Sequence, residues 1–166
     1  MTRINYQCIA DMVKEWSQTS VKGIVFEFYR PMKGEGNELW LNWAERDKVI
    51  DQLLALKETY RGFIHVSDRI YHLMRSDLAP KITQNGPFSK IGFSYDPMGK
   101  PKIPCQLGPN ADCSRCGCIL SFYSMLLTHR SLLIPEFAAS AWRKLIDQYK
   151  IRVSAIHHLS QKITAH

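Results

Sequence analysis

Four of the five cysteines lie within one short segment, at positions 105, 113, 116 and 118. The spacing is C-x7-C-x2-C-x-C, with glycines and a proline between the thiols that let the backbone curl. Two disulfides in this segment would close very small loops, and Cys116 and Cys118 are too close in sequence to bridge comfortably. The segment therefore predicts a metal ion or an iron–sulfur cluster held by thiolates.

Two inorganic centres suit four thiolates. A 4Fe–4S cluster is typically held by four cysteines and is the first interpretation. A tetrahedral zinc ion is the alternative, because C-x2-C is also a zinc spacing, and free thiols or disulfides remain a third possibility. The single residue between Cys116 and Cys118 is tight for either centre, so Cys105, Cys113 and Cys116 are the safer ligands. Cys8 stands apart and is predicted to be a small buried apolar residue.

Composition limits the class of protein. The 166 residues are 45% apolar, which is enough for the core of a single domain. No apolar run reaches the roughly 18–20 residues that span a bilayer, and the N-terminus lacks a signal-peptide pattern. We therefore expect a cytoplasmic protein with no membrane partner, in a reducing compartment that favours metal over disulfide. The net charge of +7 is scattered along the chain, which favours a solvated surface over a nucleic-acid partner.

The first half of the chain alternates between strand-like and helix-like patterns. Asn42 with Glu45 forms a capping-box pattern at one helix start. The predicted strands are 2–7, 24–29 and 63–66, and the predicted helices are 9–18, 43–60 and 68–75. Such alternation predicts a parallel sheet with helices packed outside it.

The second half begins after Pro80 with a different pattern. Residues 88–95 and 100–105 predict a β-hairpin around the turn Asp96-Pro-Met-Gly99. This hairpin would deliver Cys105 directly into the cysteine loop. An apolar stretch follows over 119–127, and a last helix is predicted over 137–149.

Two parts of the chain resemble the C-terminal half of a radical S-adenosylmethionine (radical SAM) protein. The run VKGIVFEFYRPM at 21–32, followed by LWLNWAERD at 39–47, is similar to a late barrel strand and its helix in that superfamily. The predicted hairpin with its cysteine loop is similar to the SPASM or twitch extension that carries an auxiliary cluster. The resemblance covers roughly residues 2–120.

The resemblance implies an α/β fold. We expect an incomplete radical-SAM-type (β/α) barrel of about three βα units, then a β-hairpin, a Cys-rich loop and C-terminal helices. The expected domains are the C-terminal half of a partial barrel at 1–80, the hairpin and cluster-binding extension at 81–125, and a C-terminal helix and tail at 126–166.

One motif of the family is absent from this sequence. Radical SAM proteins hold their S-adenosylmethionine-cleaving cluster through C-x3-C-x2-C, and this chain contains no such spacing. We therefore expect no cleavage of S-adenosylmethionine by this chain alone, and whether it is part of an enzyme stays open. Either the chain is a truncated or split product, or a partner subunit supplies the missing N-terminal barrel half, and S-adenosylmethionine with it. The substrate is unknown.

Four further residues are candidates for contact with that cofactor or with a substrate. Glu27, Tyr29 and Arg30 lie near the end of the strongest predicted strand, where ligands of parallel sheets gather. Alternation places Glu27 and Tyr29 on one face of that strand. Glu27 could instead form a structural ion pair with Arg30. Asn5 could point inward from the first predicted strand or simply face solvent.

The sequence thus predicts an iron–sulfur-binding portion of a radical SAM protein, with Cys105, Cys113, Cys116 and Cys118 holding an auxiliary 4Fe–4S cluster. The alternative is a non-enzymatic, zinc-stabilised module that binds a protein or a nucleic acid.

Overall fold

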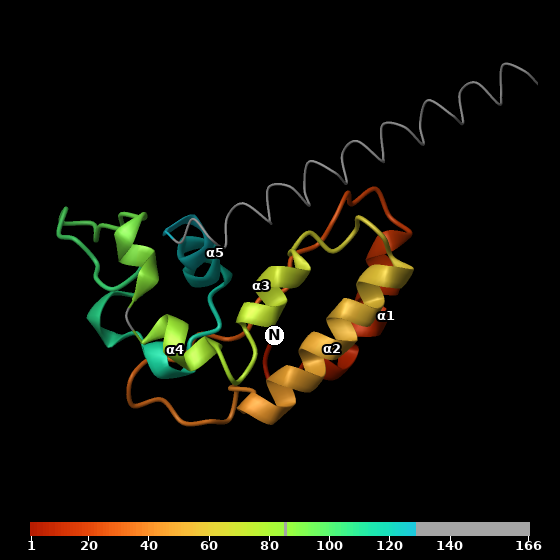
Figure 1. Ribbon diagram of the computed structural model, residues 1–166, viewed down its shortest axis with the longest axis horizontal. Coiled ribbons are helices and arrows are strands. Elements are labelled where there is room, and N and C mark those ends of the chain that lie inside the picture. The colour runs from red at the N-terminus through yellow and green to blue at the C-terminus, as the bar shows by residue number, and fades with distance from the viewer. Residues whose placement is uncertain (85, 129–166) are drawn as a thin grey trace, which may run out of the picture. The chain divides into compact units, whose positions relative to one another are not determined.

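The fold of the described chain is helical, in contrast to the predicted α/β barrel. The computed structural model describes residues 1–84 and 86–128, and Met1–Thr128 form one compact unit (Figure 1). About 47% of the described residues are helical and 5% lie in a strand or bridge, with no sheet among them. The helix predicted over 137–149 lies outside the described residues.

The elements follow in a simple order. The α-helices are α1 (Ile9–Ser17), α2 (Trp43–Thr59), α3 (Asp68–Leu73), α4 (Ala79–Thr83) and α5 (Ile119–Thr128). Short 3₁₀ turns are η1 (Tyr6–Cys8), η2 (Pro87–Lys90), η3 (Gly108–Asn110) and η4 (Cys113–Arg115). Within this order, α2 packs against both α1 and α3, and α5 packs against α3 and α4.

The predicted helices of the first half are confirmed. Residues 9–18 were expected to be helical, and α1 buries Ile9 and Val13, which share one face at a spacing of four. At the start of α2, the Asn42 Oδ1 accepts a hydrogen bond from the Glu45 N–H at 2.9 Å, and Glu45 Oε2 accepts one from the Asn42 N–H at 2.8 Å. The predicted capping box is therefore formed. At the start of α3, the Ser67 hydroxyl accepts a hydrogen bond from the Ile70 N–H at 3.3 Å, without a reciprocal box.

The predicted parallel sheet is wrong. Residues 2–7 form a turn that runs into η1, and the extended segment 24–29 makes one parallel bridge, Ile24 to Ile64. That bridge is closed by Ile24 N–H to Phe63 O at 2.8 Å and His65 N–H to Ile24 O at 3.0 Å. Parallel sheets are stable as several strands covered on both faces, and one isolated pair does not propagate. The high β-propensity of 24–29 produces an extended segment instead of a strand.

The predicted β-hairpin is also wrong, although its turn forms. The Gly99 N–H donates to Asp96 O at 3.0 Å, and the single described bridge of this region joins Tyr95 to Pro101. Pro101 and Pro104 interrupt the return segment, and proline has no N–H to donate to a ladder. The result is an arm over 91–104 that projects from the helices (Figure 1, green).

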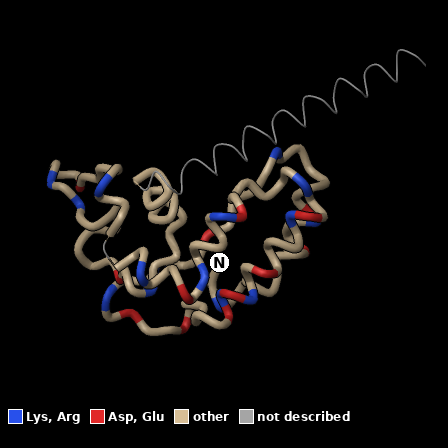
Figure 2. The backbone as a smooth tube through the Cα atoms, in the orientation of Figure 1, with Lys and Arg blue, Asp and Glu red and all other residues tan. Residues whose placement is uncertain are grey.

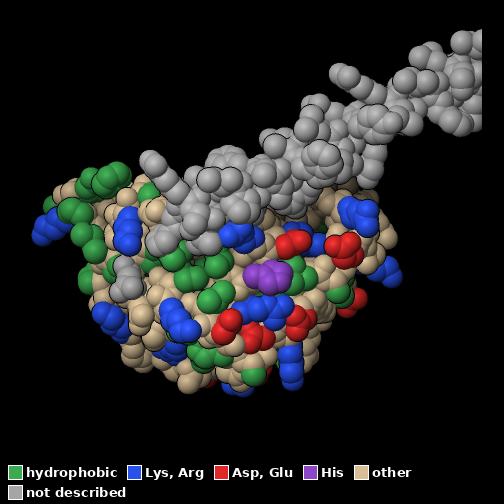
Figure 3. Space-filling model, in the orientation of Figure 1, with side chains coloured by type: hydrophobic (Ala, Val, Ile, Leu, Met, Phe, Trp, Pro, Cys, Tyr) green, Lys and Arg blue, Asp and Glu red, His purple; other side chains and the backbone are tan. Residues whose placement is uncertain are grey.

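The arm carries much of the exposed apolar surface. Its exposed large apolar side chains are Ile91, Phe93, Tyr95, Met98 and Ile103. On the face drawn in Figure 3, hydrophobic side chains gather over this part of the chain. The basic residues, in contrast, are scattered along the described chain and form no dense block (Figure 2), as the sequence predicts. None of the helices within 1–84 and 86–128 combines the length and the apolarity that a membrane span requires.

Candidate metal centre

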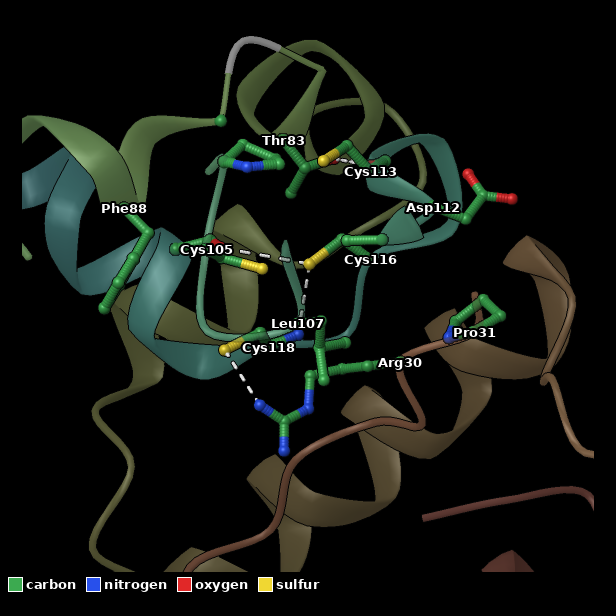
Figure 4. Close-up of a pocket in the computed structure, with 14 residues that line it drawn as sticks. Arg30, Pro31, Thr83, Phe88, Cys105, Leu107, Asp112, Cys113, Cys116 and Cys118 are labelled. Carbon is green, nitrogen blue, oxygen red and sulfur yellow. Dashed lines mark hydrogen bonds between the residues drawn. The ribbon is translucent and has the colours of Figure 1, made fainter. Parts of the chain in front are cut away.

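The four clustered cysteines line one cavity. Cys105 precedes η3, Cys113 begins η4, Cys116 directly follows η4, and Cys118 directly precedes α5. Figure 4 shows the sulfurs of Cys105, Cys113 and Cys116 directed into a shared space, with Cys118 below them beside Arg30. The fold thus brings together four thiols that the sequence spreads over a loop.

Backbone contacts hold this loop against the segment that follows the extended run 24–29. Met32 and Ala111 form an antiparallel bridge, and the Lys33 N–H donates to Asn110 O at 2.7 Å. Gly117 lies directly on Phe28, so closely that an added Cβ would stand 2.5 Å from the Phe28 carbonyl oxygen. Only glycine permits this approach, and the Phe28 N–H donates to Gly117 O at 3.2 Å across it.

Arg115 fixes the loop from within. Its guanidinium donates to Asp112 Oδ2 at 2.6 Å, to Asn37 Oδ1 at 2.7 Å and to Glu35 O at 3.0 Å. The carbonyl of Arg115 in turn accepts a hydrogen bond from the Trp40 indole at 3.1 Å. The loop 32–40 and the cysteine loop are therefore joined through one residue that lies between Cys113 and Cys116.

Arg46 supports the loop from below, out of the buried face of α2. Its side chain is fully buried, and it donates to Cys116 O at 2.8 Å and to Arg115 O at 3.3 Å. The guanidinium carbon lies 4.7 Å from the centre of the Phe28 ring and 4.4 Å from that of Trp43. No ion pair joins it to a carboxylate within the described ranges, and burial lowers the pKa of Arg46 to about 10. A buried positive charge therefore lies next to the cysteine loop.

The sulfurs themselves accept hydrogen bonds. The Cys118 N–H donates to Cys116 Sγ at 3.4 Å, and the Ser121 hydroxyl lies 3.9 Å from the same sulfur. Arg30 Nη1 donates to Cys118 Sγ at 3.6 Å. Donors of this kind stabilise a sulfur that carries negative charge, as thiolate ligands do.

The surroundings of Cys113 and Cys116, including the neighbouring thiols, shift the pKa values of these two residues. Burial raises the pKa of Cys116 to about 11. The hydrogen bond from the Cys118 N–H acts against this rise, whereas the Cys118 and Cys113 side chains add to it. Burial likewise raises the pKa of Cys113, with Cys105 contributing. Without a metal, Cys113 and Cys116 are therefore neutral thiols at pH 7, and a metal has to displace their protons to bind.

The donor set fits a thiolate-bound centre in its chemistry. Soft thiolates select zinc, copper(I) and iron–sulfur clusters. Across residues 1–84 and 86–128, however, no three Cys, His, Asp or Glu side chains are grouped closely enough to hold a metal ion. Binding would therefore require the thiols to close around the centre.

The other predicted site residues divide into two pairs. Glu27 and Arg30 lie beside the cysteines, and the predicted ion pair between them is confirmed at 3.3 Å. Tyr29 instead donates to Glu35 at 2.8 Å, and Asn5 is exposed, where its side chain accepts from the Thr2 N–H at 2.8 Å. The structure therefore places Glu27 and Arg30 at the site and leaves Tyr29 and Asn5 outside it.

Cys8 is exposed, so the prediction that it is a buried residue is wrong. It lies at the end of η1, which replaces the strand that was expected to bury it.

Sequence reasoning missed two residues of the site, Arg46 and Thr83. Arg46 precedes Val49 and Ile50 by three and four residues, which places it on the apolar face of α2, and this spacing was a readable signal. Thr83 donates to Cys113 O at 2.6 Å from the end of α4, a contact across 30 residues that no local pattern indicates.

No family model matches the chain, and comparison with curated proteins and with solved structures found no match either.

Proposed function

We propose that this protein binds an iron–sulfur cluster of the 4Fe–4S type through Cys105, Cys113, Cys116 and Cys118. The observation that carries the proposal is that all four thiols line one cavity, although the two 3₁₀ turns η3 and η4 lie along the loop between Cys105 and Cys118. When bound, such a cluster can transfer single electrons, bind a substrate or brace the fold.

The charge distribution supports an anionic centre at this place. A cluster held by four thiolates carries net negative charge, and burial of such charge requires compensation. Arg46, buried and without a described carboxylate partner, and Arg30, at hydrogen-bonding distance from Cys118, supply positive charge on two sides. Glu27 neutralises part of the charge of Arg30.

The proposal retains only the cysteine loop of the radical SAM resemblance, because the described residues form neither the expected barrel nor the expected hairpin. In that setting the cluster would be auxiliary, and S-adenosylmethionine would come with a partner subunit or barrel half that supplies C-x3-C-x2-C. Cleavage of S-adenosylmethionine by this chain is not part of the proposal, and neither is any particular substrate. A reducing cytoplasm, where thiols stay available for iron, is the proposed location.

The test is anaerobic reconstitution of the full chain with iron and sulfide. We expect a brown protein with about four irons and four acid-labile sulfides per chain, and the loss of both in a variant with serine at all four positions. Cys8→Ser is the matched control, because it removes a thiol outside the loop. A colourless protein that holds one zinc would overturn the proposal in favour of a structural zinc module.

A further inference from the structure

One cation contacts a sulfur of the site directly. Arg30 Nη1 donates to Cys118 Sγ at 3.6 Å, while its Nη2 lies 3.3 Å from Glu27 Oε1. The other carboxylate oxygen of Glu27 accepts from the Ile119 N–H at 3.4 Å, at the residue that follows Cys118. Figure 4 shows the Arg30 side chain reaching toward Cys118 from outside the group of sulfurs.

This arrangement joins two elements that are distant in sequence. Arg30 directly follows the extended segment 24–29, whereas Cys118 directly precedes α5 and Ile119 begins it. Glu27 bonds to both sides of the contact, so it holds the guanidinium in place and orients it toward the sulfur. Arg30 is therefore a fixed cation beside Cys118, and the Glu27 carboxylate lies on the other side of its guanidinium.

A fixed charge this close to a bound cluster would change its reduction potential. Uptake of one electron makes an iron–sulfur centre more negative by one unit, and a nearby cation stabilises the reduced state more than the oxidised state. A hydrogen bond to a ligand sulfur acts in the same direction, because it also favours the more negative sulfur. A carboxylate near the centre has the opposite effect.

Resting on the proposed cluster, we propose that Arg30 and Glu27 form a charge pair that sets its reduction potential: Arg30 raises the potential through Cys118, and Glu27 limits that rise. Arg30 is a positioning and tuning residue in this account, and it does not ligate iron. One-electron reduction of a bound cluster would draw on an external donor, dithionite in the experiment below, and would form or break no bond to Arg30 or Glu27.

The experiment is a redox titration of the reconstituted full chain with dithionite, followed by electron paramagnetic resonance. The variants are Arg30→Met, Arg30→Lys and Glu27→Gln, each assayed first for iron and sulfide. Arg61→Gln is the control, since Arg61 is exposed, pairs with Glu58 and follows the far end of α2. That helix is about 25 Å long and has its other end at the cysteine loop.

We expect shifts of opposite sign. Arg30→Met lowers the potential, Arg30→Lys lowers it by less, Glu27→Gln raises it, and Arg61→Gln leaves it unchanged. The proposal is overturned if loaded Arg30→Met keeps the wild-type potential, or if Glu27→Gln shifts it downward. If the Arg30→Met variant does not take up the cluster, the Arg30→Lys and Glu27→Gln variants test the proposal instead. Their reduction potentials are expected to shift in opposite directions, and shifts in the same direction would overturn it. Absence of iron from the wild-type protein would instead count against the cluster itself.

Discussion

Arg46 occupies a core position of α2 that its neighbours on the same face fill with apolar side chains. Val49, Ile50 and Leu53 continue that face and are each at most 1% exposed. The guanidinium is retained there because it satisfies two carbonyl groups of the cysteine loop, at Arg115 and Cys116. An apolar replacement would leave both carbonyls without that donor.

Replacing Arg46 therefore tests how the loop is held. We expect Arg46→Met to lower the free energy of unfolding of the metal-free protein by about 2–4 kcal/mol, as charged hydrogen bonds and packing are lost together. Urea unfolding measures this change. Lys48→Met, on the exposed side of the same helix, should change stability by less than about 0.5 kcal/mol. Equal effects of the two substitutions would show that Arg46 does not support the loop.

The Cys116 thiol gives a second prediction at this scale. Its pKa of about 11 leaves little thiolate at pH 8, so alkylation in the metal-free protein should be more than about 100-fold slower than for an unburied thiol. The rate should rise about tenfold per pH unit until the thiol titrates. Peptide mass spectrometry after iodoacetamide treatment measures it, and a plateau near pH 9 would contradict the assigned burial.

The same raised pKa couples protonation of Cys116 to folding. Between the unfolded pKa of about 8.5 and the folded value of about 11, the folded metal-free protein binds more protons than the unfolded chain. Its stability should therefore be complete below about pH 8.5 and fall as the pH rises through that window.

At the scale of elements, helices were predictable and strands were not. The capping box at Asn42 and the spacing of Ile9 and Val13 are local signals that suffice to define a helix. A strand, in contrast, depends on a partner that the sequence pattern does not specify. The extended run at 24–29 has the composition of a strand, yet its Phe28 N–H pairs with Gly117 of the cysteine loop.

The N-cap of α2 gives a prediction about the stability of a single helix. Asn42→Ala removes the acceptor for the Glu45 N–H and should cost about 1 kcal/mol of unfolding free energy. Asn42→Asp keeps an acceptor at the same place and should cost much less. Thermal unfolding followed by circular dichroism measures both. If the alanine variant has the same melting temperature as the wild-type protein, the cap does not contribute to stability.

At the scale of the whole molecule, the cysteine loop connects the two halves of the compact unit. Through Arg115 it bonds to residues 35 and 37, through Thr83 to α4, and through Arg46 to α2. The sequence indicated the chemistry of this loop by the spacing of its cysteines. It did not indicate these connections, because they join residues 30 to 80 positions apart through single side chains.

Because the loop connects these parts, a bound centre should stabilise all of them. We expect reconstitution to raise the melting temperature by about 5 °C or more, since any ligand that binds only the folded state stabilises it. Removal of iron by a chelator should reverse the rise. The variant with serine at all four loop positions should show no change with iron and sulfide, and a matching rise in that variant would contradict the assignment.

The most direct measurement is native mass spectrometry of the reconstituted chain under anaerobic conditions. The account predicts one species heavier than the metal-free protein by four irons and four sulfides, which disappears when Cys105, Cys113, Cys116 and Cys118 are replaced by serine. A wild-type chain that stays at its metal-free mass, or that gains the mass of one zinc ion, would contradict it.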